Sequence, residues 1–150
     1  MGKAPSQTLT IRKATYRDIP ALVELAETLL PGEASSKQRV RVLSRSMKDP
    51  DYYVLTAQVG GASAGFIDLW IFPDFAEGSE IAIIQNLVVA PAFRGRGIAH
   101  ALVMRGVELA KKRGAKEVHV STEMRNKRAI SLYREHGFSK LYAFLEKSPL

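Results

Sequence analysis

Two arginines and two glycines alternate in the string Arg94-Gly95-Arg96-Gly97, which follows an apolar run and precedes a helical pattern. The first turn of a helix leaves backbone N–H groups without intrahelical partners, and the helix dipole adds partial positive charge there. Glycines let an anion approach that backbone closely, and the two arginines add formal charge beside it. This combination predicts a binding site for a diphosphate group at the start of the helix.

Other phosphate-binding loops do not fit this string. A P-loop requires G-x-x-x-x-G-K-[ST], which is absent, and the dinucleotide fingerprint G-x-G-x-x-G would need glycine where His100 stands. Arginine-glycine strings also bind RNA, but they usually lie in disordered tails rather than between a buried strand and an amphipathic helix. A merely tight turn between strand and helix is the structural alternative.

The charge of the chain is unevenly placed. There are 22 Lys and Arg against 15 Asp and Glu, a net charge of +7, and residues 76–150 hold 13 of the basic and 7 of the acidic side chains. The half that contains the arginine-glycine string should therefore attract an anion. A basic, solvated helix surface would explain the same excess.

Cysteine is absent from the 150 residues. Its absence excludes a disulfide framework, a thiolate metal site and a cysteine nucleophile, and it agrees with a reducing compartment. The three histidines lack a metal-ligand spacing, and no window approaches eighteen uninterrupted apolar residues. We therefore predict no metal site and no membrane partner, and we expect a soluble, cytoplasmic protein.

Hydrophobic periodicity predicts one domain over residues 8–150 after a flexible tail at residues 1–7. The helical patterns cover 18–30, 36–48, 98–113 and 126–136, and the strand patterns cover 9–12, 52–59, 62–72, 81–89, 117–122 and 138–147. This order predicts an α/β fold, in which a mixed sheet is flanked by about four helices. The segment from Ile81 to Thr122 should form a right-handed parallel crossover.

Several of these residues resemble the GCN5-related N-acetyltransferase (GNAT) family. The resemblance rests on Leu87-Val88-Val89, on Arg94-x-x-Gly97-x-Ala99 and, after another strand, on Asn126-x-x-Ala129-x-x-Leu132-Tyr133-x-x-x-Gly137-Phe138. It covers about residues 8–147 in element order, and its motifs fall within residues 81–138. The two later motifs, joined at this distance, make the resemblance specific.

This resemblance implies a GNAT-like fold that binds acetyl-CoA or coenzyme A. A V-shaped opening between the strand that ends near Val89 and the parallel strand 117–122 would admit the pantetheine arm. Backbone groups of Leu87 and Val89 would bond that arm, and the arginine-glycine loop would hold the pyrophosphate. The residues that the resemblance assigns to cofactor binding are Leu87, Val88, Val89, Arg94, Gly95, Arg96, Gly97, Ile98, Ala99, Asn126 and Tyr133.

The reaction that the resemblance implies is direct transfer of an acetyl group to a primary amine of a small molecule or a peptide. Tyr133 matches the family tyrosine beside the CoA sulfur, and a phenol with a pKa of about 10 can protonate the departing thiolate. Packing of the last helix is the alternative role for Tyr133. Glu80 lies roughly where some family members hold a glutamate that acts as base through water, and an ordinary loop carboxylate is the alternative. Backbone N–H groups at a strand bulge would serve the oxyanion.

The acceptor is less well defined by the sequence. Gln85 and Asn86 are polar residues in an apolar strand, so they need partners, and they would line the acceptor cleft or bond a neighbouring loop. The segments that shape the acceptor site in the resembled family contain aromatic residues and carboxylates, namely Tyr52, Tyr53, Trp70, Phe72, Phe75, Glu33, Asp68, Asp74, Glu77 and Glu80. These would suit a cationic amine, or equally a hydrophobic core with solvated edges. A polyamine, an aminosugar, an amino acid and a peptide N-terminus all stay open.

Two other functions compete with acetyl transfer. One is a CoA-binding regulatory module without turnover, and the other is a basic nucleic-acid-binding domain. The aromatic residues are concentrated in the first half of the chain and the basic excess in the second, so we expect no nucleic-acid partner. Only 13 residues follow Gly137, enough for one strand or a very short pair where the family usually has two strands, so we expect that a homodimer could cover an exposed sheet edge.

Overall fold

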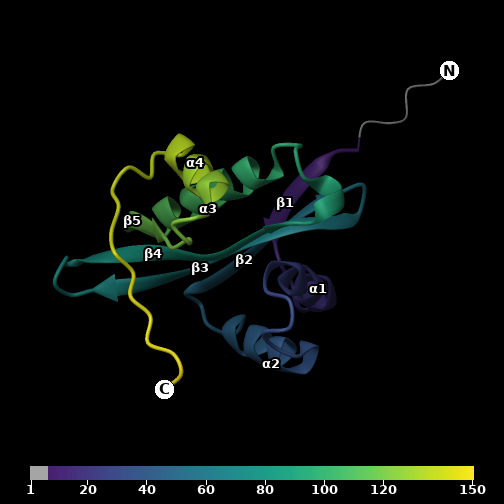
Figure 1. Ribbon diagram of the computed structural model, residues 1–150, viewed down its shortest axis with the longest axis horizontal. Helices are drawn as coiled ribbons and strands as arrows, with labels where there is room; N and C mark the ends of the chain where they lie inside the picture. Colours follow the sequence, from purple (N-terminus) through teal and green to yellow (C-terminus); the bar gives the residue numbers. More distant parts are fainter. Residues whose placement is uncertain (1–6) are drawn as a thin grey trace.

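Five strands form one sheet in the computed structural model, which describes residues 7–150 (Figure 1). In chain order they are β1 (Leu9–Lys13), β2 (Tyr52–Val59), β3 (Ala62–Asp74), β4 (Ser79–Val89) and β5 (Ala115–Val120). They lie side by side in that order, and neighbours are antiparallel except for the parallel pair β4 and β5. The predicted mixed sheet is confirmed. The predicted flexible tail falls, apart from residue 7, outside the described residues.

Four α-helices cover the two faces of this sheet in the described part of the chain (Figure 1). α1 (Ile19–Leu29) and α2 (Ser36–Ser46) lie on one face, while α3 (Ile98–Lys112) and α4 (Lys127–Glu135) lie on the other. Two short 3-10 helices, η1 (Tyr16–Asp18) and η2 (Pro91–Phe93), precede α1 and α3. None of the helices within residues 7–150 has the length and apolar character needed to cross a membrane.

The larger hydrophobic core lies between the sheet and the α3–α4 layer. Ile67, Leu69 and Ile84 from the sheet are almost completely buried there together with Leu102 of α3. α3 packs closely because Gly106 has no side chain, and a Cβ at this position would lie 3.2 Å from Cδ1 of Ile67. This packing fixes the start of α3 relative to the end of β4.

A second core lies under α1 and α2. Its buried members include Leu22 and Leu25 of α1, which recur at helical spacing, together with Phe66 of β3 and Val88 of β4. α2 is attached more loosely, because no residue of α2 is fully buried. The α1–α2 layer therefore covers its face of the sheet incompletely.

An ion pair attaches β1 to the start of α1. The two guanidinium nitrogens of Arg12 each lie 2.8 Å from a carboxylate oxygen of Asp18, and the N–H of Thr15 donates to the same carboxylate at 2.7 Å. The side chain of Asp18 is almost completely buried. The hydrogen bonds from Arg12, followed by those from Thr15, lower the pKa of Asp18 to about 2 despite the opposing effect of burial.

The predicted last strand over residues 138–147 is wrong. Residues 138–150 carry no regular secondary structure, and Figure 1 shows this segment (yellow) crossing the strand direction rather than lying along β5. Its apolar side chains are mostly exposed, including Leu141, Tyr142 and Phe144. Apolar and aromatic alternation describes a fit to a half-buried pleated surface, and without a neighbouring strand it does not produce a strand.

Candidate active site

The loop before α3 leaves the first backbone N–H groups of that helix available to an anion. Gly97 precedes the helix with a φ of 78°, and Gly95 has a φ of 76°, angles that favour glycine. No atom lies within 4 Å of the place where a Cβ would stand at either glycine. Among the described residues no side chain caps this end of α3. The open space and the unpaired N–H groups fit the diphosphate that the sequence predicts here.

Both arginines of the loop are held against its backbone. Nε of Arg94 donates to the carbonyl of Val89 at 3.1 Å, which brings the guanidinium to the end of β4. Nη2 of Arg96 donates to the carbonyl of Ala92 at 3.4 Å, and its guanidinium carbon lies 5.2 Å from the ring centroid of Phe93. The two formal charges therefore add to the positive end of the α3 dipole.

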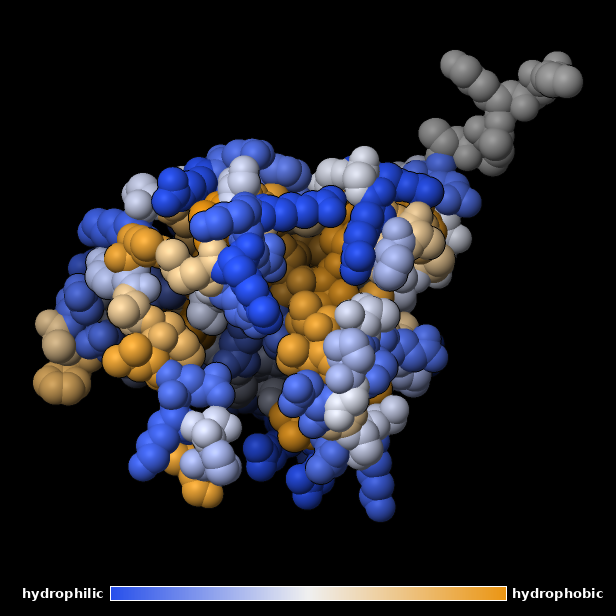
Figure 2. Space-filling view, in the orientation of Figure 1, coloured by the Kyte–Doolittle hydropathy of each residue, from blue (hydrophilic) through white to orange (hydrophobic). Residues whose placement is uncertain are grey.

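β4 and β5 separate part of the way along β4. Their parallel pairing ends at Ile84 and Val120, whereas β4 continues to Val89 paired only with β3. Residues 85–89 thus have one edge without a neighbouring strand. In Figure 2 hydrophobic atoms (orange) gather in a hollow between the α3–α4 layer and the α1–α2 layer, with hydrophilic side chains (blue) along its upper rim. The separation of β4 from β5 lies where the family resemblance implies a V-shaped opening.

The backbone of β4 alternates between β3 and this opening. The N–H of Ala90 donates to the carbonyl of Ala64 at 2.8 Å, so it points towards β3. Because successive residues of a strand direct their polar groups to opposite sides, Val88 also points towards β3, while Leu87 and Val89 point towards the opening. The structure therefore brings Leu87 and Val89 to the opening and keeps Val88 away from it.

Gly65 permits a close approach of β3 to the end of β4. A Cβ at this position would lie 2.4 Å from the carbonyl oxygen of Val88 and 3.2 Å from Cα of Val89. Both atoms belong to backbone, which cannot rotate away as a side chain can. The geometry of the open edge thus depends on a glycine that the sequence analysis did not single out, and a glycine inside a strand pattern is the signal that indicates such a contact.

A bulge occurs in β4 where the opening begins. Asn86 pairs with Asp68 of β3 and Ile84 pairs with the next residue of β3, so Gln85 has no partner of its own on that strand. The side-chain oxygen of Gln85 accepts a hydrogen bond from Nε1 of Trp70 at 3.1 Å. The polar pair that the sequence analysis expected to bond a loop or line a cleft is therefore held by side chains of β3.

A buried carboxylate holds the bulge in place. Asp68 is 5% exposed and accepts hydrogen bonds from the backbone N–H of Asn86 at 2.8 Å, from its side-chain amide at 3.0 Å and from the hydroxyl of Tyr52 at 2.6 Å. Burial raises the pKa of Asp68 above its ordinary value, against the effect of these donors. Burial and the nearby Asp68 carboxylate raise the pKa of Tyr52 as well.

Tyr133 lies on α4 with its ring in the larger core. It is 8% exposed, and its ring meets Phe138 edge-on with centroids 5.5 Å apart. Within the described residues no hydrogen bond involves its hydroxyl, and burial raises the pKa of that hydroxyl to about 12. The packing role that the sequence left open is therefore present, together with a hydroxyl that keeps its proton at neutral pH.

Asn126 begins α4, as the sequence predicts. Its side-chain oxygen accepts a hydrogen bond from the backbone N–H of Ala129 at 3.1 Å, which caps the helix. The amide nitrogen of Asn126 is left as a donor. The residue can therefore cap α4 and still offer a hydrogen bond to a ligand.

Glu80 lies at the far end of β4 from the opening. It pairs with Pro73 of β3 and Ala115 of β5, and its side chain is exposed. Five residues separate it from Gln85, roughly 16 Å of strand at about 3.3 Å per residue. The structure does not bring Glu80 together with the bulge, so its role as base stays a prediction.

Two histidines that are far apart in the sequence meet between α3 and α4. Nδ1 of His100 lies 3.0 Å from Nε2 of His136, and Nε2 of His100 lies 3.6 Å from a carboxylate oxygen of Glu135. Burial, followed by the charge of His100, lowers the pKa of His136. Within residues 7–150 no group of three or more His, Cys, Asp or Glu side chains could hold a metal ion.

Tyr52, Asp68 and Asn86 were each named from the sequence as candidates near the acceptor site, but their connection in one network was not predicted. The visible signals are a charged residue inside the apolar strand that ends near Phe72 and the polar Asn86 in the next strand. A buried charge requires partners, but the partners here come from two other strands, and the one-residue bulge decides which of them faces Asp68.

Comparison with known proteins gives a consistent result. The acetyltransferase (GNAT) family model matches residues 19–138. Among curated relatives, the uncharacterized N-acetyltransferase MJ1207 of Methanocaldococcus jannaschii is 32% identical over 142 residues, covering 89% of this chain and 62% of that protein. The uncharacterized N-acetyltransferase YhfO of Bacillus subtilis is 28% identical over 142 residues, covering 91% of this chain and 94% of that protein. The chain thus spans somewhat under two thirds of the length of MJ1207.

Solved structures share the fold. The aminoglycoside N-acetyltransferase AAC(6')-Iy in complex with CoA has a TM-score of 0.84 at 20% identity, with 98% of this chain and 100% of that chain covered. Glucosamine-6-phosphate N-acetyltransferase from Arabidopsis thaliana has a TM-score of 0.80 at 21% identity, with 94% and 98% covered. At 20% and 21% identity, these two structures show that the fold is shared.

Proposed function

This chain belongs to the acetyltransferase (GNAT) family, and on that premise we propose that it transfers the acetyl group of acetyl-CoA directly to a primary amine of a small molecule or a peptide. The family resemblance seen in the sequence is confirmed by the match. The observation that carries the proposal is the junction at Val89. There the open edge of β4 meets Arg94 and the uncapped start of α3.

The residues around this junction suit the two halves of the donor. N–H groups of Ile98 and Ala99, with the two loop arginines, would hold the pyrophosphate. Backbone groups of Leu87 and Val89 and the amide nitrogen of Asn126 would hold the pantetheine arm. When bound, acetyl-CoA supplies an activated thioester with a thiolate leaving group.

Tyr133 is the proposed general acid. Its pKa of about 12 keeps the hydroxyl protonated at neutral pH, so it can give a proton to the sulfur as the thiolate departs. Backbone N–H groups at the Gln85 bulge would stabilise the oxyanion. Glu80 is the base that the sequence proposes, acting through water, and Glu80→Gln should then lower kcat.

The proposed function is tested by release of CoA thiol with a panel of primary amines, beside thermal unfolding with and without acetyl-CoA. We expect acetyl-CoA to raise the Tm and at least one amine to accelerate thiol release above the hydrolytic background. Stabilisation by acetyl-CoA without any amine-dependent release would instead identify a CoA-binding module without turnover. The absence of stabilisation would contradict both.

A further inference from the structure

A cavity of about 340 Å³ lies between the sheet and the α1–α2 layer. Its lining includes Gln85 and Asn86 of the bulge, so one end of the cavity reaches the point where β4 and β5 separate. The volume is at the small end of the range for ligand pockets. The cavity therefore offers a small molecule access to the proposed site of acetyl transfer from the side opposite α3 and α4.

Most of the cavity wall is apolar. Leu22, Ala26 and Leu30 contribute from α1 and the residue after it, Val42 and Leu43 from α2, and Phe66 from β3. A wall of this kind binds a molecule by removing apolar surface from water, at about fourfold in affinity for each methylene buried. These apolar side chains offer no hydrogen-bonding group to a heavily hydroxylated acceptor.

Tyr52, Asp68, Gln85 and Asn86 are the polar residues at the end near the bulge, and Gln38, Arg39 and Ser46 line the α2 side of the cavity. Asp68 is the one carboxylate that lines the cavity within the described residues, and the hydroxyl of Tyr52 lines it too. Since the Tyr52 hydroxyl donates its proton to Asp68 at 2.6 Å, the lone pairs of its oxygen are left to accept a hydrogen bond. An N–H group at this end would meet an acceptor backed by a negative charge.

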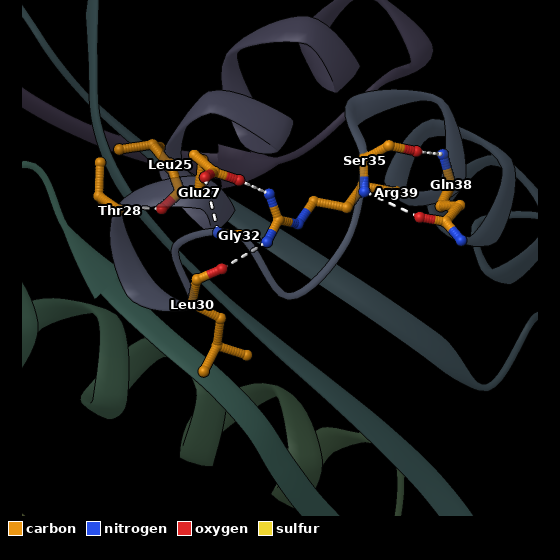
Figure 3. Close-up of polar contacts among 8 residues, drawn as sticks. All are labelled: Leu25, Glu27, Thr28, Leu30, Gly32, Ser35, Gln38 and Arg39. Carbon is orange, nitrogen blue, oxygen red and sulfur yellow. Dashed lines mark hydrogen bonds and ion pairs between the residues drawn. The ribbon is translucent and has the colours of Figure 1, made fainter.

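The outer wall is held by contacts between α1, α2 and the loop that joins them (Figure 3). Arg39 forms an ion pair with Glu27 and donates to the carbonyl of Leu30 at 2.6 Å, and Glu27 also accepts from the N–H of Gly32 at 2.9 Å. The positive charge of Arg39 is thereby neutralised at the wall. Among the described lining residues, Asp68 is then the one Asp, Glu, Lys or Arg side chain without an ion-pair partner.

We propose that this cavity binds the acceptor as a small primary amine carried on an apolar chain or ring, with its nitrogen towards the Tyr52 hydroxyl and Asp68. The proposal rests on the acetyltransferase function proposed above. An acceptor with several ammonium groups fits poorly, because a second buried cation would have no carboxylate to pair with. The geometry thus favours an alkylamine or arylalkylamine over a polyamine or an aminosugar.

Tyr52 and Asp68 can also remove the proton of the bound ammonium. The ammonium N–H proton passes to the oxygen of Tyr52 while the hydroxyl proton of Tyr52 passes to Asp68. The amine is left neutral with its lone pair free, Tyr52 is unchanged, and Asp68 holds the proton until it returns to water. Burial, which raises the pKa of Asp68, favours this acceptance.

The acceptor class is tested with ethylamine, butylamine, hexylamine and 2-phenylethylamine against ethanolamine, glucosamine and spermidine. Thiol release gives kcat/KM for each, and calorimetric titration into the CoA-loaded protein gives the Kd without turnover. We expect affinity and kcat/KM to rise about fourfold per methylene until the cavity is filled. Hexylamine and 2-phenylethylamine should exceed all three hydrophilic amines.

Two exposed valines of α2 provide a matched pair of variants. Val42 lines the cavity and is 47% exposed, whereas Val40 does not line it and is 40% exposed. Val42→Asp places a charge in the apolar wall and should reduce the gain to less than about twofold per methylene, compared with about fourfold in the unchanged chain. Val40→Asp should keep the gain of about fourfold in amine affinity per methylene. Both variants should keep the Tm increase given by acetyl-CoA.

Tyr52→Phe tests the polar end. It should lower kcat for hexylamine by about tenfold or more while the ratio of hexylamine to butylamine Kd stays unchanged. Full retention of kcat in this variant would remove Tyr52 from the proton path, with thermal unfolding as the check that the fold is intact.

The results separate the two proposals. The proposed acceptor class would be overturned if affinity and kcat/KM did not rise with the chain length of the alkylamine, or if thiol release were faster with spermidine or glucosamine. Either result would leave the acetyltransferase proposal intact. Chain-length-dependent binding without thiol release would support the cavity assignment and overturn the acetyltransferase. Equal effects of Val42→Asp and Val40→Asp would overturn the assignment of the cavity.

Discussion

The α3–α4 side of β4 and the α1–α2 side are built from different kinds of group. On the first side, adjacent residues 94–99 present backbone N–H groups and two guanidinium groups. On the second, side chains from α1, α2 and three strands enclose an apolar cavity with Asp68 at one end. An anion site made of backbone N–H groups needs glycine beside the start of a helix, and the residues of such a site are neighbours in the sequence. Recognition through a side-chain cavity needs positions that come together only in space.

The largest effect is expected from Tyr133→Phe, which changes the α3–α4 side and leaves the α1–α2 side unaltered. It removes the proposed acid from the α3–α4 side, so kcat should fall about a hundredfold, within the range of general acid catalysis. Because the phenyl ring keeps the core contact with Phe138, the Kd for acetyl-CoA should change by less than about twofold. Stopped-flow thiol release and calorimetry give the two quantities, and wild-type turnover would remove Tyr133 as the acid.

Gly65→Ala breaks both sides at once. The new Cβ must displace the backbone of β4 at Val88, which should lower the free energy of unfolding by about 2 kcal/mol. Gly106→Ala is the comparison variant, because its Cβ would meet side-chain atoms of Ile67 and Leu69 rather than backbone, and the helix gains propensity. Urea unfolding measures both, and equal stability of the two variants would contradict the backbone contact.

Asp18→Asn acts on the α1 side alone. Since the folded pKa of Asp18 is lowered to about 2, its ionised form stabilises the fold above the unfolded pKa, and this stability is lost as the pH falls through about 2. At pH 7 the variant should lose about 2 kcal/mol of unfolding free energy, and the difference should vanish at low pH. Urea titrations at several pH values measure it.

The control for Asp18→Asn is Glu24→Gln, which removes an exposed carboxylate from α1. It should leave the unfolding free energy within about 0.5 kcal/mol of the unchanged chain. A loss in Asp18→Asn that stayed constant with pH would contradict the linkage to Arg12.

The smallest effect is expected on the α3–α4 side, from Arg94→Ala or Arg96→Ala. Each exposed arginine should contribute about tenfold to acetyl-CoA affinity at low salt, because it pairs with phosphate beside a helix start, and less as salt screens the pair. Calorimetry at two salt concentrations measures this. Lys111→Ala, at the other end of α3, is the control and should leave the affinity unchanged. A salt-independent affinity in all three would contradict the diphosphate site.

Local signals in the sequence were enough for most of the fold. The caps, glycines and periodic patterns predict the four helices, and Gly60-Gly61 predicts the β2–β3 turn, because each signal acts within a few residues. The segment 138–147 has a strand pattern equally strong, yet pairing depends on a partner that lies elsewhere in the chain. The absence of a strand over residues 138–147 shows that the pattern of one segment does not predict whether it pairs at the edge of a sheet.

The candidate site divides along the same line. The glycine loop, the open edge at Val89 and the cap at Asn126 were all expected from the sequence. A bulge in this strand was implied by the family resemblance, but its position at Gln85 was not, because the mainly apolar run from Ile81 to Val89 gives no sign of register. Without the register, the pairing of Asp68 with Asn86 and Tyr52 could not be derived.

The single unpaired residue at Gln85 also reverses parity along β4. Before it, the even-numbered Ala82 and Ile84 join the core beneath α3, whereas after it the even-numbered Val88 joins the core beneath α1 and the odd-numbered Val89 takes the α3 side. Deleting one amino acid here would turn every later side chain of β4 to the opposite face of the sheet. The one unpaired residue therefore decides which later side chains of β4 join the core beneath α3 and which join the core beneath α1.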